Sequence, residues 1–282
     1  MAMKGTGTQT DPYLVDNIAD FRAASVKDNV YIKLTADLDC NEEGYLEWQT
    51  LTSRCKEVDF DGHDLINPLI ATSNYLINSS ITPLYKNGQI LNVYENGAYG
   101  VLRSVALLNM SVSAFLTKPV DTPFHSIAAT KCNFVINNQN LNNEAWFLAN
   151  SDAHGMTAFK DCRFELYGNV CTSDSTFQSW NSISGNITAD GCRFEGTLKR
   201  TSNADFFEGT IQNCVFAVNT RFGVDPSISS GDLAGIAKNT NIYQSDISVF
   251  SNHDSAIPCT SEQILDPDHN NSVGFTVVEV TS

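Results

Sequence analysis

The sequence predicts an all-β fold, a single-stranded parallel β-helix in which about eight coils stack into one column, with a short N-terminal capping helix and a C-terminal cap. Three observations predict it. A short phrase recurs along the chain, apolar residues alternate within each copy, and the repeating unit has no helix of its own. A unit of about 22 residues without a helix cannot bury its apolar side alone, so the copies must stack on one another.

The recurring phrase is Cys-x-Phe, an alternation of period two that indicates a strand with both named residues facing inward. Four copies are complete: Cys132-Asn133-Phe134, Cys162-Arg163-Phe164, Cys192-Arg193-Phe194 and Cys214-Val215-Phe216. Other residues take the Cys position elsewhere, which gives eight copies registered at residues 58, 93, 110, 132, 162, 192, 214 and 245. The residue before the Cys position is mostly Asn, Asp or Gly, which favours a tight corner there.

Stacking of these copies predicts two ladders inside the column. One ladder is formed by Val93, Met110, Cys132, Cys162, Cys192 and Cys214, and the other by Phe134, Phe164, Phe194 and Phe216. We interpret the cysteines as buried thiols that act as apolar spacers, because Val and Met take the same register and no His accompanies them. Metal binding or redox chemistry is the alternative. For Cys40 and Cys55, outside the ladder, a free pair is favoured over a disulfide.

Both ends of the chain differ from the repeats and are expected to cap the column. Residues 15–25 place Ile18, Phe21 and Ala24 on one face at helical spacing, with Asp16 as the N-terminal cap. Residues 30–34 alternate as the first strand. Residues 260–265 predict a short helix over the far end, followed by a strand at 275–280. We therefore divide one continuous domain into a cap (1–57), the coils (58–250) and a second cap (251–282).

Composition and charge limit the classes of function that the chain can have. The chain has 282 residues, 42% of them hydrophobic, which excludes a disordered linker. Its 17 basic and 32 acidic residues give a net charge of −15, so we expect neither nucleic-acid binding nor membrane insertion. The start of the chain lacks an apolar export segment, and we expect synthesis in a cytoplasm without a signal peptide. We expect no cofactor and no metal.

Several phrases in the first 95 residues carry a resemblance to a known family. They are Gly5-Thr6-Gly7-Thr8, Asp11-Pro12-Tyr13-Leu14-Val15, Tyr31-Ile32-Lys33-Leu34-Thr35-Ala36-Asp37-Leu38-Asp39, Phe60-Asp61-Gly62-His63 and Pro83-Leu84-Tyr85-Lys86-Asn87-Gly88-Gln89-Ile90. With them the chain resembles the capped, pectate-lyase-like right-handed β-helix proteins that occur in phage particles and on bacterial surfaces. The resemblance implies the handedness and the N-terminal cap, but no activity.

The sequence contains no polysaccharide lyase or glycoside hydrolase signature, so we lean away from an enzyme. The strongest acidic cluster, Asp59, Asp61 and Asp64 beside His63, is interpreted as a turn on an early coil rather than a catalytic group. The candidate surface for a carbohydrate or a protein partner comprises Trp146, Asp152, His154 and Trp180, in or beside polar segments expected to bulge from the coils.

These observations favour a structural protein of a phage virion, either a capsid decoration protein or an accessory head or tail protein, with an adhesive or stabilising role. Its expected partners are other virion proteins such as the major capsid protein, a host surface glycan, or further copies of itself. Two alternatives stay open. One is a tailspike-like polysaccharide depolymerase, and the other is a surface adhesin that binds glycans without cleaving them.

Overall fold

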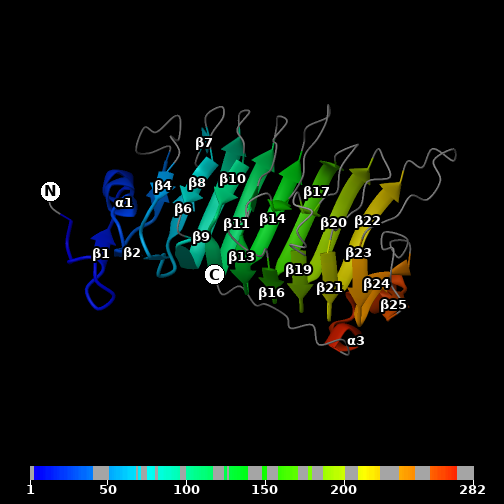
Figure 1. Ribbon diagram of the computed structural model, residues 1–282. Helices are drawn as coiled ribbons and strands as arrows, with labels where there is room; N and C mark the ends of the chain where they lie inside the picture. Colours follow the sequence, from blue (N-terminus) through cyan, green and yellow to red (C-terminus); the bar gives the residue numbers. More distant parts are fainter. Residues whose placement is uncertain are drawn as a thin grey trace.

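The computed structural model is a parallel β-helix, in which successive strands line up along one column (Figure 1). It describes residues 3–40, 51–67, 69–70, 75–79, 82–95, 100–116, 124–125, 127–138, 148–150, 158–170, 177–179, 187–200, 209–222, 235–244 and 255–271. The described strands form one sheet of 19 strands and one of 6, and strands of successive coils pair in parallel. The predicted all-β solenoid is confirmed.

The larger sheet runs the length of the column from β1 to β25. Its strands are β1 (Tyr13–Val15), β2 (Tyr31–Leu34), β3 (Leu38–Asp39), β5 (Glu57–Asp59), β6 (Asp64–Ile66), β7 (Leu69–Ile70), β9 (Leu84–Glu95), β11 (Ala106–Leu116), β13 (Ala128–Thr130), β14 (Asn133–Asn138), β16 (Ala158–Lys160), β17 (Arg163–Val170), β19 (Ile187–Asp190), β20 (Arg193–Arg200), β21 (Gly209–Gln212), β22 (Val215–Phe222), β23 (Gly235–Lys238), β24 (Thr240–Tyr243) and β25 (Ala256–Cys259). The smaller sheet contains β4 (Leu51–Ser53), β8 (Tyr75–Ser79), β10 (Gly100–Arg103), β12 (Phe124–His125), β15 (Leu148–Asn150) and β18 (Phe177–Ser179). Parallel stacking therefore already includes β1 to β3, ahead of residue 58.

The phenylalanines of the recurring phrase stack inside the column, and all four are buried. Neighbouring rings are nearly parallel, with centroids 5.0 Å apart for Phe134 and Phe164 and 4.8 Å apart for Phe164 and Phe194. Phe216 continues the stack at 5.8 Å with a tilt of 39°. The same register continues towards the N-terminus through Val112. Aromatic stacking of this kind adds about 1 kcal/mol per pair to the burial of the rings.

Residues 110, 132, 162, 192 and 214 share one register, but the positions predicted for the other copies are wrong where the structure describes them. Gly88, not Val93, pairs with Met110, and Val93 pairs with Ala114. Asn87 and Asn92 both adopt positive φ, but the corner residue Asn109 donates to Asn87, whereas Asn92 donates to Asn67. The register shifts beside Asn92, where β9 bulges.

Two further register predictions fail at the ends of the series. Val58 pairs with Ile32 and Tyr85, in a strand before the corner rather than after it. Thr240 takes the place after Cys214, because its neighbour Asn241 pairs with Val215. Residue 245 lies outside the described part of the chain. The interpretation of this position as an apolar spacer is therefore incomplete, since Gly88 and Thr240 also occupy it.

The N-terminal helix is α1 (Ile18–Ser25), and its residues Ile18, Phe21 and Ala24 are buried as predicted. Its cap is Asn17 rather than Asp16, because the helix begins one residue later than expected. The Asn17 side chain accepts a hydrogen bond from the Asp20 amide at 2.9 Å. The strand predicted at 30–34 is β2, and β1 precedes it. Residues before β1 cover its outer edge, where Leu14 N donates to Lys4 O at 2.9 Å.

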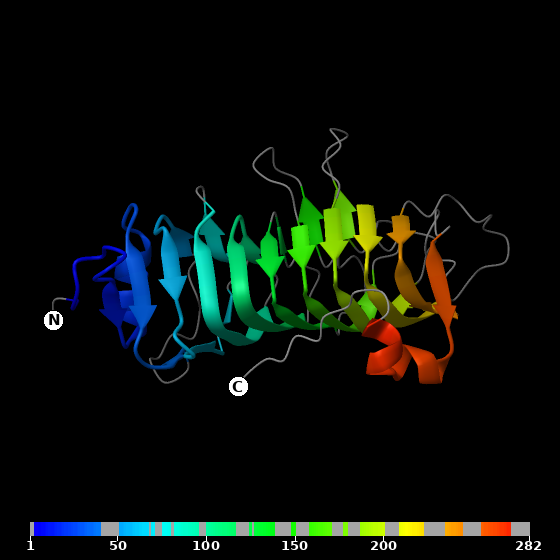
Figure 2. The ribbon, with the colours of Figure 1, turned by 90° about the horizontal axis from the view of Figure 1, so that it is seen from below.

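The C-terminal helix α2 (Ser261–Leu265) begins where predicted, after Thr260, which forms a capping box with Gln263. It is followed by α3 (Pro267–Asn271). These helices cover the side of the column near its end, not the end itself as predicted (Figure 2). Ile264 packs on Val215, which points outward between the inward Cys214 and Phe216. The strand predicted at 275–280 lies outside the described residues.

The side is covered because the apolar residues lie there. On the outer face of β22, Val215 is completely buried beneath α2, although its position on the two preceding coils holds arginine. Covering Val215 with Ile264 removes from water a surface that would otherwise be exposed. The change from arginine to valine at one outward position therefore provides an apolar contact for α2, while Asn241 on β24 holds α3 by hydrogen bonds to His269 O and Asn270 Oδ1.

Candidate functional site

The four predicted surface residues, Trp146, Asp152, His154 and Trp180, lie outside the described residues. The strands that precede three of them in the chain are described. β15 and β18 lie on neighbouring coils and pair through Leu148 with Phe177 and Asn150 with Ser179. Asp152 and His154 follow β15 in the sequence, and Trp180 follows β18.

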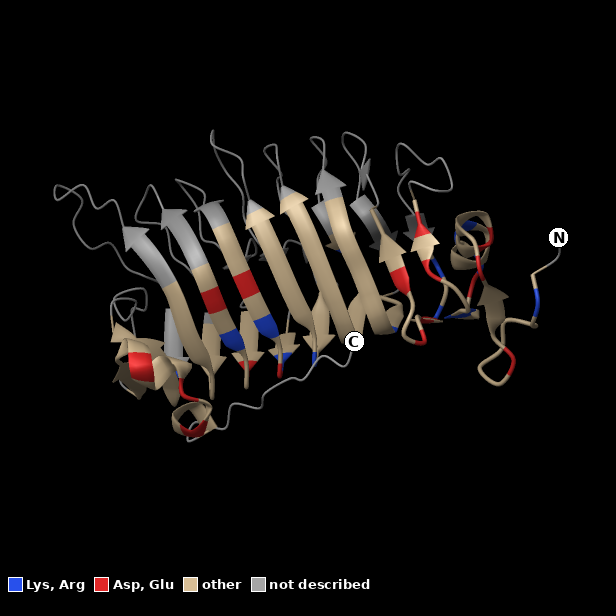
Figure 3. Ribbon diagram, turned by 180° about the vertical axis from the view of Figure 1, so that it is seen from behind, with Lys and Arg blue, Asp and Glu red and all other residues tan. Residues whose placement is uncertain are grey.

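The described residues bring a different set of polar groups together, on the outer face of β17 and β20. Cys162, Phe164 and Leu166 are buried, so the residues that alternate with them, Arg163, Glu165 and Tyr167, face outward. β20 repeats the pattern with Arg193 and Glu195. Figure 3 shows these charges as a patch separate from the charges around the first strands.

The register of the two strands places like residues beside each other. Arg163 pairs with Arg193 and Glu165 pairs with Glu195. Like charges directly opposite each other destabilise a sheet. The alternation of arginine and glutamate within each strand removes the conflict, because each charge also has an opposite charge two residues away.

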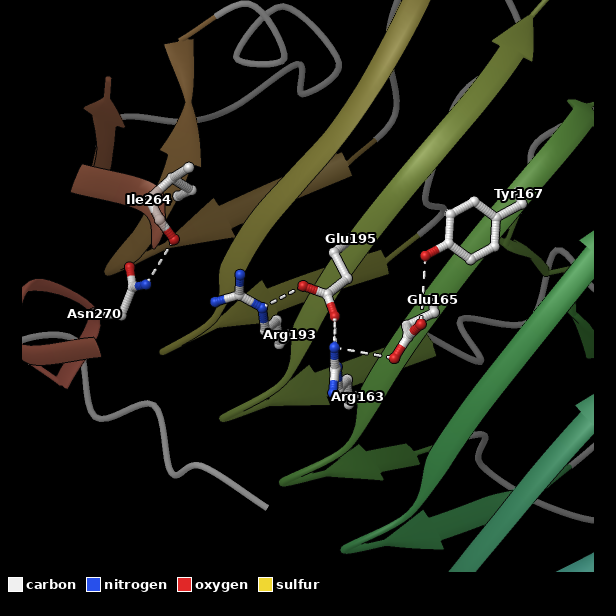
Figure 4. A network of polar contacts seen from close by, with 7 residues as sticks. All are labelled: Arg163, Glu165, Tyr167, Arg193, Glu195, Ile264 and Asn270. Carbon is white, nitrogen blue, oxygen red and sulfur yellow. Dashed lines mark hydrogen bonds and ion pairs between the residues drawn. The ribbon is translucent and has the colours of Figure 1, made fainter. Parts of the chain in front are cut away.

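The side chains form one connected network (Figure 4). Arg163 Nη2 lies 3.0 Å from Glu165 Oε1, and the Arg163 guanidinium also donates to Glu195 on the next coil. Arg193 Nε lies 2.7 Å from the other carboxylate oxygen of Glu195. Tyr167 donates its hydroxyl hydrogen to Glu165 Oε2 at 3.3 Å. We call these five residues the Arg–Glu network.

The network holds its carboxylates as hydrogen-bond acceptors. The side chains of Glu165 and Glu195 are 22% and 18% exposed, so both groups are partly withdrawn from water while a guanidinium binds them. Burial, followed by the charge of Glu165, raises the pKa of Tyr167, which therefore keeps its proton and donates. Tyr167 is 38% exposed and available to contact a partner.

The acidic cluster of the early coils is also bound by cations. Asp61 Oδ2 lies 2.7 Å from Lys33 Nζ, and Asp59 lies 3.4 Å from Lys86 Nζ. His63 does not bind these aspartates but contacts Asp37 at 3.1 Å. Asp61 also adopts a positive φ of 52°, and Gly62 follows with 86°, which makes a turn at this position. The cations come from neighbouring coils, so the cluster joins those coils.

Within the described ranges, no group of three or more His, Cys, Asp and Glu residues is arranged to hold a metal ion. The seven cysteines in those ranges are buried and form no disulfide bonds, and they include Cys40 and Cys55. None of the described helices is long and apolar enough to cross a bilayer.

Sequence reasoning missed the Arg–Glu network although its signal is visible. Cys162-Arg163-Phe164-Glu165 and Cys192-Arg193-Phe194-Glu195 repeat the same four residue types 30 positions apart. The inward Cys and Phe predict the strands, but they assign no role to the outward Arg and Glu. In a parallel stack, an outward pair that repeats with the coil must meet its own copy.

Comparisons with known proteins give no family. No family model and no curated protein matches the chain. Among solved structures, the chain is similar to a "putative immunoglobulin A1 protease" from Bacteroides ovatus. The two are 16% identical with a TM-score of 0.49, over 86% of this chain and 78% of that chain.

Proposed function

We propose that this chain is a structural protein of a phage virion, a capsid decoration protein or an accessory head or tail protein with an adhesive or stabilising role. The N-terminal phrases that resemble those of capped β-helix proteins in phage particles support the proposal. So does the net charge of −15, which keeps a slender column soluble and limits self-association before assembly.

The observation that carries the proposal is the pairing of groups from coil to coil on both surfaces of the sheet. Inside, the phenylalanine rings stack at 4.8 to 5.8 Å. Outside, the Arg–Glu network and the contacts of Lys33 and Lys86 join neighbouring coils. A column joined in this way resists bending, as a part that presents a surface on a particle requires.

A depolymerase is the second candidate, and one observation favours it. Glu165 and Glu195 are direct neighbours on adjacent coils, which lie about 4.8 Å apart. The two carboxyl groups of a retaining glycosidase are about 5 Å apart. One of them must donate a proton, however, whereas here both carboxylates accept hydrogen bonds from the Arg163 guanidinium. The network is therefore better suited to binding a glycan than to cleaving one.

The virion role is tested by following the chain through particle purification. An antibody against the chain is applied to density-gradient fractions of a lysate from the phage-producing cells. We expect the chain to sediment with intact particles, and cryo-electron microscopy of those fractions to show regular copies on the capsid or a few copies at the tail. Recovery of the chain only in particle-free fractions would overturn the virion role.

The glycan functions are tested separately with the purified chain. A binder retains polysaccharide without releasing reducing ends, whereas a depolymerase releases them. Glu195→Gln keeps the shape of the side chain and removes its charge, so it should abolish any release. Lys33→Gln, on the distant first coils, serves as the matched control. If the wild type releases reducing ends, Glu195→Gln abolishes the release and Lys33→Gln preserves it, the chain is a depolymerase rather than a binding protein.

A further inference from the structure

Successive amides of a parallel strand donate alternately to the preceding and the next coil, and in the larger sheet this alternation is interrupted at the corner. The amide of Asp161 donates to Asp190 O on the next coil at 2.9 Å. The amide of Arg163 donates to Cys132 O on the preceding coil, also at 2.9 Å. Cys162 lies between these two residues, at the point where the alternation is interrupted. Its amide follows a corner residue with a φ of 52° and cannot use the regular ladder in either direction.

Side chains of the next coil accept these amides. Cys162 N donates to Cys192 Sγ at 3.4 Å, and Cys192 N donates to Cys214 Sγ at 3.3 Å. Cys214 N donates to the hydroxyl of Thr240 at 3.4 Å. All of these residues are at most 1% exposed, so water does not provide an alternative acceptor. A buried amide without an acceptor destabilises the folded state. The sulfur atoms therefore serve as hydrogen-bond acceptors and do not only fill space.

Each side chain of the series also donates within its own coil. The thiols of Cys162, Cys192 and Cys214 donate to the carbonyl two residues earlier, at 3.3, 3.4 and 3.0 Å. The hydroxyl of Thr240 donates to Lys238 O in the same way at 2.8 Å. Thr240 therefore reproduces both hydrogen bonds of a cysteine, which an apolar side chain cannot do.

We propose that Cys162, Cys192, Cys214 and Thr240 form a series of hydrogen-bond relays that fixes the stacking of the coils. Each side chain accepts a hydrogen bond from the amide that follows the corner on the coil before it. It also donates a hydrogen bond to a carbonyl of its own coil. The cysteines are then required for their sulfur, and a hydroxyl is the substitute that preserves the relay. This differs from the interpretation of the cysteines as apolar spacers, under which valine would be the better substitute.

Valine and threonine have nearly the same shape and differ in the hydroxyl group, so they separate the two interpretations at one position. Cys192→Val and Cys192→Thr are prepared with ¹⁵N-labelled cysteine, which reduces the amide spectrum to the cysteines alone. The signal of Cys162 is assigned by its loss in Cys162→Ser. Amide exchange of Cys162 is then compared in the wild type and in both variants.

We expect the Cys162 amide to exchange about tenfold faster in Cys192→Val than in Cys192→Thr, and the threonine variant to unfold at the higher temperature. Ile136, in the regular strand β14, is the matched control. Ile136 is 1% exposed. There Ile136→Val should be more stable than Ile136→Thr, because no backbone amide at that position needs a side-chain acceptor and the buried hydroxyl would lack a partner.

Equal or slower exchange in Cys192→Val would overturn the relay and restore the apolar spacer. The Cys214 pair repeats the test with the Cys192 amide as its readout, should a Cys192 variant not fold. Folding of the threonine variants alone supports the relay, and folding of the valine variants alone contradicts it. Rapid exchange of the Cys162 and Cys192 amides in the wild type would contradict it without any substitution.

Discussion

The first coils and the middle coils of the column join their neighbours by different means. Around β2, β5 and β9, lysines bridge to carboxylates on adjacent coils, and Asn87 donates to Asp59 at 3.1 Å. From β14 to β22, stacked phenylalanine rings fill the interior, and the Arg–Glu network joins β17 to β20 on the outer face. Figure 3 shows this uneven distribution of charge along one face.

The difference shows which repeated side chains stabilise a parallel stack of coils. A coil places each side chain beside its own counterpart, so identical aromatic rings gain contact when they repeat. Identical charges repel when they repeat and need an opposite charge two residues along the strand. The middle coils satisfy both conditions through Cys-Arg-Phe-Glu. The first coils do not repeat a phrase and are joined by individual pairs instead.

The largest effect is expected from breaking the aromatic stack. Phe164 contacts Phe134 and Phe194 at 5.0 and 4.8 Å and Phe159 at 4.9 Å. Phe164→Ala should lower the free energy of unfolding by about 4 kcal/mol, measured by denaturant titration. Leu65→Ala, in the same register on an early coil, should cost about 3 kcal/mol. A larger loss at Leu65 than at Phe164 would contradict the comparison.

The next effect concerns the close approach of two early coils at Gly88. A Cβ added there would lie 2.2 Å from Phe60 Cβ and 2.4 Å from His63 O, and the latter atom belongs to the backbone. Gly88→Ala should therefore lower the free energy of unfolding by about 3 kcal/mol. Gly62→Ala is the control, with nothing within 4 Å of its Cβ but a φ of +86°, and should cost about 1 kcal/mol. Equal losses would show that Phe60 and the backbone at His63 shift cheaply to admit the added Cβ.

Gly88 also shows why the sequence predicted the fold better than the register. Alternation of Cys and Phe depends on local geometry, so the strands and the stacked ladder could be predicted from it. Gly88 carries no side chain, and the need for it arises from Phe60 on another coil. Similarly, the position of α2 depends on Val215, whose outward direction matters only once Ile264 is known to lie above it. Contacts between distant segments produce no periodic pattern of residues, so they cannot be predicted from the sequence in this way.

A smaller effect is expected when the Arg–Glu network is broken. Arg163→Gln removes the cation between Glu165 and Glu195, which then repel each other across adjacent strands. We expect a loss of about 1 kcal/mol at low salt that shrinks in 1 M salt, measured by thermal unfolding. Adding Glu195→Gln should restore much of the stability, since the second charge is then gone. A loss independent of salt and of Glu195 would indicate that Arg163 acts through packing alone.

The smallest effect concerns Asp64 on the early coils. Burial, followed by the charge of Asp37, raises the pKa of Asp64, and its Oδ1 is buried with no hydrogen-bond partner. The folded protein thus binds this proton more tightly than the unfolded chain, whose pKa is about 3.9. The stability contributed by the proton is present below that value and is lost as the pH rises through the folded pKa.

Asp64→Asn should therefore raise the melting temperature slightly at pH 7, and the gain should disappear below about pH 3.5. Asp61→Asn is the matched control with the opposite sign, because it removes the partner that raises the pKa of Lys33 and should lower the melting temperature at pH 7. Opposite responses from two aspartates three residues apart would show that the first coils depend on each individual pair. Equal responses would mean that the early coils respond to the summed charge of the face rather than to individual pairs.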